Sequence, residues 1–120
     1  MAKILAVDDS ASMRGMVSFT LRGAGHEVTE AENGQRALDA ARGSTFELVL
    51  ADVNMPVMDG IAMVRELRAM EAYKGVPILM LTTESQSQKK MEGKAVGATG
   101  WLVKPFDPEQ LLATVERVLR

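Results

Sequence analysis

Carboxylates, hydroxyls and an ammonium group directly follow short apolar runs in this sequence of 120 residues. The residues are Asp8, Asp9, Asp52, Thr82, Thr83 and Lys104. Short apolar runs of this kind predict strands. The carboxyl ends of parallel strands meet at one edge of a sheet, which is where such sheets bind their ligands. These side chains are therefore the candidates for chemistry.

The three carboxylates would repel one another, and burial against apolar strand ends would make their charge more costly. A hard divalent cation would relieve both effects. An all-oxygen donor set without nearby Cys or His favours Mg²⁺ over zinc, and Mn²⁺ could substitute. Lys104 could pair with the remaining anionic charge. A carboxylate in such a site can attack phosphorus and form an aspartyl phosphate.

Each of these residues also has an ordinary structural explanation. An Asp at a strand end is commonly a turn or helix cap, Thr82 could be a cap, and Lys104 could lie in a surface turn. The convergence of several strand ends favours the chemical interpretation. Asp59 is assigned to a turn and cap without chemistry. His26, the only histidine, is assigned a structural role away from the cluster.

The elements that would position these residues alternate between strand and helix, five times over. The predicted strands span residues 4–7, 27–31, 48–51, 77–81 and 101–103. Four of them are almost wholly apolar, which is typical of parallel strands covered on both faces, whereas the mixed stretch 27–30 suits an edge strand. The pattern predicts an α/β domain with a doubly wound parallel sheet.

The segments between the strands have the apolar periodicity of helices, most clearly the last one. Asp107 can cap that helix, Pro108 fits its first position and Gln110 stands at the capping-box position. The fourth helix, residues 87–96, has few apolar anchors and an internal Gly93. Its intrinsic stability should be low, and we expect it to be the mobile helix.

The composition is typical of one globular domain over residues 1–120, with 47% hydrophobic and 25% charged residues. A net charge of −2 without a polybasic run argues against nucleic-acid binding. The absence of cysteine excludes disulfides and thiolate chemistry. The four apolar residues before Asp8 are too few for a signal peptide or membrane helix, so we expect a cytoplasmic location without membrane contact.

Four motifs of the chain resemble those of the receiver domain of two-component response regulators, over essentially its full length. They are Val7-Asp8-Asp9-Ser10, the run from Asp52 to Gly60, Leu81-Thr82-Thr83 and Lys104-Pro105-Phe106. Each is a common short string, but the four in this order and at these spacings are highly specific. The resemblance implies a flavodoxin-like (βα)5 fold with strand order 2-1-3-4-5. It is closest to the stand-alone regulators of chemotaxis.

The resemblance also implies roles for the motif residues. Asp52 would accept the phosphoryl group and, with Asp9, would ligate Mg²⁺ directly. Asp8 would be a ligand through water, and the backbone carbonyl of Asn54 would be the third protein ligand. Lys104 would pair with the phosphoryl group, and its bond to the following proline would be cis.

Thr82 and Trp101 occupy the two switch positions of the family, although Tyr or Phe is commoner than Trp at the second. Val57 and Glu84 flank the site where family members vary, so we expect them to influence the rate of phosphate hydrolysis. The domain would be a phosphoacceptor that dephosphorylates itself, and not an enzyme.

The implied partners are proteins, namely a histidine kinase that donates the phosphoryl group and a target that binds the phosphorylated monomer. No output domain is expected. The target would contact Lys89, Lys90, Lys94 and Trp101, although these lysines could equally form a solvated face. In chemotaxis the target would be the flagellar motor switch. The alternative is a phosphate sink or a stand-alone receiver outside chemotaxis.

Two further alternatives differ in their residues. A small aspartate-nucleophile phosphatase of the haloacid dehalogenase type also uses strand-end carboxylates, Mg²⁺, Thr and Lys. That family places its general acid Asp two residues after the nucleophile, where this chain has Asn54. A degenerate receiver that only binds partners usually lacks an acidic residue or the lysine, and neither is missing here.

Overall fold

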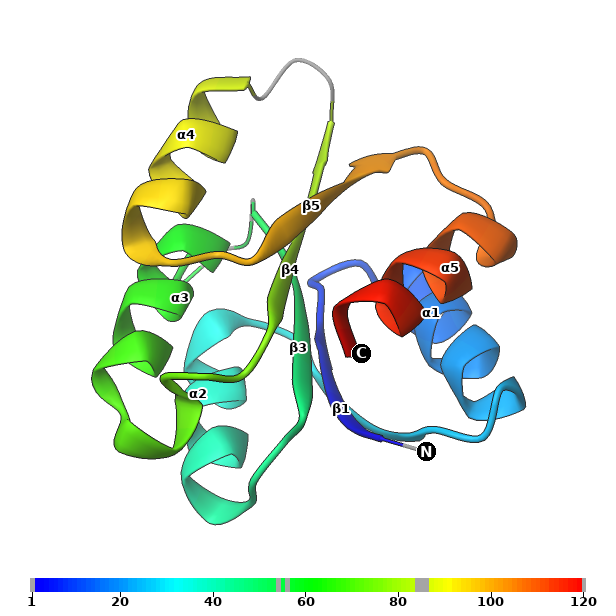
Figure 1. Ribbon diagram of the computed structural model, residues 1–120, viewed down its shortest axis with the longest axis horizontal. Helices are drawn as coiled ribbons and strands as arrows, with labels where there is room; N and C mark the ends of the chain where they lie inside the picture. The colour runs from blue at the N-terminus through cyan, green and yellow to red at the C-terminus, as the bar shows by residue number, and fades with distance from the viewer. Residues whose placement is uncertain (1, 54, 56, 84–86, 120) are drawn as a thin grey trace.

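The computed structural model describes residues 2–53, 55, 57–83 and 87–119, and for residues 83, 87–90 and 93 the description is of the backbone. Five strands form a parallel sheet in the order β2-β1-β3-β4-β5 (Figure 1). The strands are β1 (Lys3–Val7), β2 (Glu27–Ala31), β3 (Leu48–Asp52), β4 (Ile78–Thr83) and β5 (Gly100–Lys104). The predicted fold class and strand order are confirmed.

Helices cover both faces of the sheet (Figure 1). On one face lie α1 (Ala11–Gly23) and α5 (Pro108–Leu119), and on the other lie α2 (Gly34–Gly43), α3 (Gly60–Ala69) and α4 (Ser87–Val96). A short 3-10 helix, η1 (Glu71–Tyr73), follows α3. Within the described ranges, no helix has both the length and the apolar character needed to cross a membrane.

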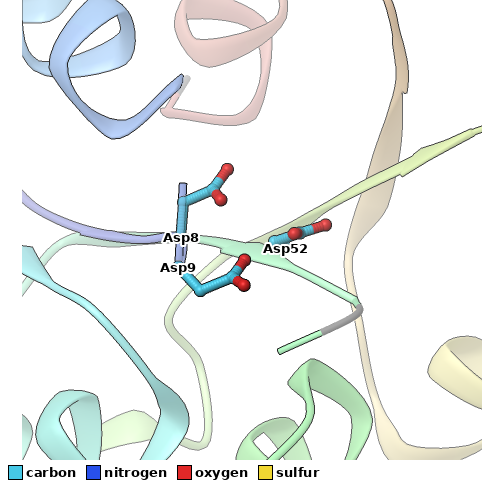
Figure 2. A group of neighbouring side chains, drawn as sticks. All are labelled: Asp8, Asp9 and Asp52. Carbon is cyan, nitrogen blue, oxygen red and sulfur yellow. The ribbon is translucent and has the colours of Figure 1, made fainter. Parts of the chain in front are cut away.

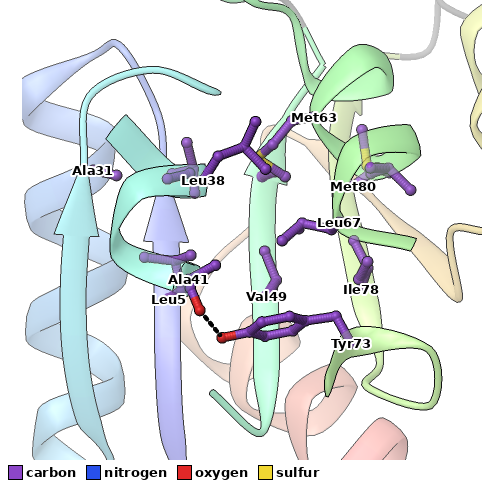
Figure 3. Close-up of a cluster of buried hydrophobic side chains, with 14 of the residues drawn as sticks. Leu5, Ala31, Leu38, Ala41, Val49, Met63, Leu67, Tyr73, Ile78 and Met80 are labelled. Carbon is purple, nitrogen blue, oxygen red and sulfur yellow. Dashed lines mark hydrogen bonds between the residues drawn. The ribbon is translucent and has the colours of Figure 1, made fainter. Parts of the chain in front are cut away.

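Two apolar cores result, one on each face of the sheet. Side chains alternate between the faces along a strand, so Leu5 and Val7 of β1 enter the core beneath α2 and α3, while Ile4 and Ala6 enter the core beneath α1 and α5. Figure 3 shows the first core, where the Tyr73 hydroxyl lies 3.0 Å from the carbonyl oxygen of Ala41. The sheet is therefore held on both sides, and its carboxyl edge is the part left open for a site.

Three local predictions from the sequence are confirmed. The Asp59 carboxylate caps α3 by accepting from the Ala62 amide at 2.8 Å. Asp107 and Gln110 form the predicted capping box, with Gln110 N to Asp107 Oδ1 at 2.8 Å and Asp107 N to Gln110 Oε1 at 2.9 Å. His26 precedes β2 at the amino edge of the sheet, where its Nδ1 accepts from the Ala2 amide at 3.0 Å. Its structural role is confirmed.

Several strands extend further than the apolar runs suggested. Asp52, Thr82 and Lys104 lie within β3, β4 and β5, because the ladder pairs Asp52 with Leu81 and Thr83 with Lys104. The apolar run 101–103 belongs to β5, which lies at an edge of the sheet, as β2 does. The fourth helix has the predicted bounds, and its mobility remains a prediction.

Gly60, the first residue of α3, packs against the end of β3. Its amide donates to the Val53 carbonyl at 2.9 Å. A Cβ added at Gly60 would overlap the carbonyl oxygen of Asp52 and lie 2.8 Å from Cε of Met80. The absence of a side chain at Gly60 is therefore what lets α3 begin directly beside Asp52.

We predict that Gly60→Ala lowers the free energy of unfolding by about 1–3 kcal/mol, because the methyl group forces the backbone of α3 away from β3. Gly15→Ala is the matched control, since Gly15 is exposed on α1 and an added Cβ meets nothing within 4 Å. It should stabilise the protein by up to about 1 kcal/mol. Urea unfolding measures both. Equal stability of Gly60→Ala and the parent would show that α3 does not need this close approach.

Candidate functional site

Three carboxylates converge at the carboxyl edge of the sheet. Asp8 and Asp9 follow β1, and Asp52 is the last residue of the neighbouring strand β3. A carboxylate oxygen of each lies within 4.8 Å of one from each of the others. Figure 2 shows the three side chains pointing out of these strand ends into the same region. Asp8 and Asp52 are buried, with residue exposures of 2% and 8%, whereas Asp9 is exposed.

Lys104 supplies the cationic charge closest to this cluster among the described side chains. Its Nζ lies 3.2 Å from Oδ1 of Asp52 and 3.6 Å from Oδ2 of Asp8. Because β4 separates β5 from β3, the lysine must extend across a strand to reach Asp52. Its side chain is only 19% exposed, so the two ion pairs are shielded from bulk water.

Asp8 is fixed by its surroundings, apart from one carboxylate oxygen. Its Oδ1 accepts from the Ser10 amide at 2.9 Å, its own amide donates to the carbonyl of Ala31 at 3.1 Å, and its carbonyl accepts from Arg14 at 2.7 Å. Its Oδ2 is buried and has no hydrogen-bond partner among the described residues. The Lys104 ammonium lies 3.6 Å from this oxygen, beyond hydrogen-bond distance, and a buried carboxylate oxygen without a hydrogen bond is costly unless a further cation or water is supplied.

The pKa of Asp52 is raised above that of an ordinary aspartate. Burial is the main cause, and the negative charges of Asp8 and Asp9 raise it further. Lys104 opposes them by its charge and its hydrogen bond. The net direction shows that one lysine does not compensate the burial of the Asp52 carboxylate together with the repulsion of its two neighbours.

The donor set fits a hard divalent cation. All three groups are carboxylates, which suit Mg²⁺ or Mn²⁺ and not a thiolate-seeking metal. Oδ2 of Asp8, which has no hydrogen bond within the described ranges, and the buried charge on Asp52 are the two features that such an ion would satisfy in addition to Lys104. Asn54, the other predicted ligand, lies outside the described residues.

The two predicted switch residues share one face of the sheet. Trp101 pairs with Met80, and both side chains belong to the core on the face covered by α3 and α4. Thr82 lies two residues after Met80 on β4, so its side chain points to the same face. Thr82 is fully buried, and its hydroxyl has no hydrogen-bond partner among the described residues. Trp101 is half-buried against the core, and its indole N–H is buried without a partner within the same ranges.

The other residues that the sequence singled out have the following positions in the structure. The bond between Lys104 and Pro105 is cis, as predicted. Val57 is 82% exposed with φ 70°, and Lys94 is exposed on α4. Glu84 lies outside the described residues, and of Thr83, Lys89 and Lys90 the backbone alone is described.

Sequence reasoning missed Arg14, whose guanidinium contacts the backbone between the two acids. It also gave no role to Ser10, whose amide binds Asp8 and whose hydroxyl caps α1 by accepting from Met13 at 3.2 Å. Ser10 carries a signal that could have been used, because Ser before a helix is a common N-cap. The contact of Arg14 depends on the tertiary placement of a long side chain and had no comparable signal.

Residues 4–116 match the family described as the response regulator receiver domain. The chain belongs to this family. As a receiver domain, it is 38% identical over 119 residues to the chemotaxis protein CheY homolog of Campylobacter jejuni, covering 98% of this chain and 92% of that one. It is 39% identical over 117 residues to the phosphate regulon transcriptional regulatory protein PhoB of Pseudomonas aeruginosa. The receiver domain spans 51% of PhoB.

Solved structures of receiver domains agree with this assignment. The chemotaxis response regulator CheY4 of Vibrio cholerae is 59% identical with a TM-score of 0.94, and the match covers 98% of each chain. The receiver domain of a sensor histidine kinase from Pseudomonas aeruginosa is 30% identical with a TM-score of 0.91, covering 98% of this chain and 97% of that one. That structure has a magnesium ion coordinated in its active site cleft.

We predict that Asp52→Asn raises the free energy of unfolding at neutral pH in the presence of a chelator. A raised pKa means that the folded state binds this proton more tightly than the unfolded state does, so ionisation of Asp52 destabilises the fold as pH rises through its folded-state pKa. The gain should vanish below about pH 4, where the carboxyl is neutral in both states. Urea unfolding across this pH range measures it.

Asp39→Asn is the control, because Asp39 is an exposed residue of α2 paired with Arg42. Its substitution should change stability by less than about 0.5 kcal/mol at any pH. If Asp52→Asn were no more stable than the parent at neutral pH, pairing with Lys104 would outweigh burial and repulsion.

Proposed function

We propose that this receiver domain accepts a phosphoryl group on Asp52 from a phosphohistidine of a sensor kinase, in the presence of Mg²⁺, and that phosphorylation changes a protein-binding surface. The observation that carries the proposal is the Asp52 carboxylate, which lies 3.2 Å from the Lys104 ammonium and beside two further carboxylates. This arrangement offers a nucleophile, a fixed cation and a set of metal ligands at one strand end.

In the proposed reaction, a carboxylate oxygen of Asp52 attacks the phosphorus. The P–O bond forms as the P–N bond of phosphohistidine breaks, and the released imidazole takes up a proton. Mg²⁺, held by Asp9 and Asp52 directly and by Asp8 through water, would neutralise charge on the phosphoryl oxygens. Lys104 already contacts Asp52, so its ammonium can follow the charge onto the phosphoryl group without reorganisation.

Thr82 supports the proposed switch. Its buried hydroxyl has no partner within the described ranges, which leaves a donor available beside the strand that ends at Asp52. A phosphoryl oxygen would give this hydroxyl a charge-assisted bond, worth about 1.5–3 kcal/mol. Because the bond exists only in the phosphorylated state, it can bias a two-state element. Trp101, on the same face, is the proposed second part of that element.

The proposed pathway is chemotaxis, in which the phosphorylated domain binds the flagellar motor switch. The support is the 59% identity to a chemotaxis response regulator over 98% of both chains. The exposed Lys94 on α4 and the half-buried Trp101 on β5 would belong to the binding surface. A phosphate sink is the alternative. Binding to a motor-switch peptide, with and without phosphate, distinguishes the two.

The proposal also states how the phosphate is lost and where in the cell the domain acts. The domain is a phosphoacceptor that loses its phosphate by self-catalysed hydrolysis, and it does not turn over an external substrate. We place it in the cytoplasm, where a kinase and its ATP would be accessible.

We predict that the parent gains one phosphate from acetyl phosphate or phosphoramidate with Mg²⁺, and that Asp52→Asn gains none. The phosphate should be released by hydroxylamine, as an acyl phosphate is. Intact-protein mass spectrometry measures the gain. Chelation of the metal should prevent it. Asp39→Asn is the matched control and should be phosphorylated as fast as the parent. Equal labelling of Asp52→Asn would contradict the assignment of the acceptor.

We also predict that beryllofluoride with Mg²⁺ changes the fluorescence of Trp101, which is the only tryptophan. The change should be largely lost in Thr82→Ala, although this variant can still be phosphorylated on Asp52. The physical reason is that the bond from Thr82 is what distinguishes the two states. An identical change in Thr82→Ala and in the parent would show that the coupling does not depend on Thr82.

A further inference from the structure

Arg14 joins two elements at the backbone of the acid pair. Its Nη1 donates to the Asp8 carbonyl oxygen at 2.7 Å, and its Nε donates to Oε1 of Glu30 at 3.1 Å. The arginine side chain is 20% exposed and the glutamate side chain is 33% exposed. One guanidinium on α1 therefore ties the end of β1 to a carboxylate on β2.

The contact acts on the peptide group that links Asp8 to Asp9. The carbonyl that accepts from Arg14 belongs to this peptide, so the guanidinium fixes the plane from which Asp9 projects. The rest of Asp8 is held as well, by Ser10 at its Oδ1 and by Ala31 at its amide. These bonds do not include Oδ2 of Asp8, which lies 3.6 Å from the Lys104 ammonium, or the exposed carboxylate of Asp9.

We infer that Arg14 is a positioning residue for the carboxylates of Asp8 and Asp9, and that Glu30 holds Arg14 in place for this task. The metal affinity of the domain then depends on a β2 residue that does not belong to the acidic cluster. The inference rests on the proposed Mg²⁺ site, and it adds to that site a supporting layer of residues.

Arg22 is the arginine to compare with Arg14, because it also contacts β2. It also lies on α1, it pairs with the other oxygen of Glu30 at 3.5 Å, and its Nη2 donates to the carbonyl of Val28 at 3.0 Å. Both arginines thus tie α1 to β2, but the contacts found for Arg22 do not include Asp8. Any effect that appears at Arg14 and not at Arg22 concerns the acid pair.

Charge and geometry predict opposite effects at Arg14. If only its positive charge mattered, removing it would tighten the binding of a cation nearby. If it positions the acids, removing it would weaken binding. Arg14→Lys separates the two effects best, because it keeps the positive charge but replaces the planar guanidinium and its several donors with a single ammonium. It cannot serve Asp8 and Glu30 in the present geometry.

The test is calorimetric titration of Mg²⁺ alone into the parent and variants. Arg14→Lys should raise the dissociation constant about tenfold, which is the usual size of losing a group that orients a metal ligand. Arg22→Lys should change it by less than about twofold, because an exposed pair contributes little. Glu30→Gln should weaken Mg²⁺ binding when it is introduced into the parent. Introduced into Arg14→Lys, it should cause little further loss, since both substitutions remove the same restraint. Unaltered affinity in Arg14→Lys, or an equal loss in Arg22→Lys, overturns the inference.

A second measurement does not need the metal. Amide hydrogen exchange at Ser10, observed by NMR without Mg²⁺, reports the bond from Ser10 to Asp8. It should accelerate in Arg14→Lys and in Glu30→Gln, and stay at the parent rate in Arg22→Lys. If the parent itself binds no Mg²⁺, the proposed function fails, and this exchange rate alone decides the positioning role. Equal rates in Arg14→Lys and the parent would refute it.

Discussion

The burial of neighbouring carboxylates is the constraint on which the rest of the structure depends. Asp8, Asp9 and Asp52 offer oxygens within 4.8 Å of one another, and two of the three residues are buried. Lys104 lies within 4 Å of both buried carboxylates, yet the pKa of Asp52 remains raised. Burial and, after it, repulsion therefore make the charge of Asp52 unfavourable in the folded state, and a bound cation would relieve both effects. The electrostatics of such a site favour the binding of a cation even before the cation is present.

The fold produces this arrangement by ordinary means. Parallel pairing brings the ends of β1 and β3 side by side, and covering helices on both faces leave the carboxyl edge as the open region. Gly60 allows α3 to begin beside Asp52, and Arg14 holds the peptide between the two other acids. The buried carboxylates at the edge therefore destabilise the fold, and the apolar packing in the two cores offsets this cost. A protein that only needed to be stable would place fewer charges there.

Much of this could be predicted from the sequence, for a definite reason. Apolar runs predict the strands, and the residue after each run must lie at the carboxyl edge of the sheet. That Asp52 and Lys104 lie at this edge could therefore be predicted from their positions alone. The capping box at Asp107 was found because it is local. Arg14 and the close approach at Gly60 could not be found in this way, because each depends on how elements distant in sequence pack. The half-burial of Trp101 depends likewise on the neighbouring helix and core.

The central claim is that the carboxylate cluster is built for a divalent cation, and unfolding in the presence of Mg²⁺ tests it most directly. The parent should gain about 2.7 kcal/mol of unfolding free energy at a hundredfold excess of Mg²⁺ over its dissociation constant. KCl at matched ionic strength should give no such gain. Asp9→Ala should lose most of it, and Asp8→Ala less, because the role proposed for Asp8 is that of a ligand through water. Equal stabilisation by Mg²⁺ in the parent and in Asp9→Ala, or none in the parent, would contradict the account.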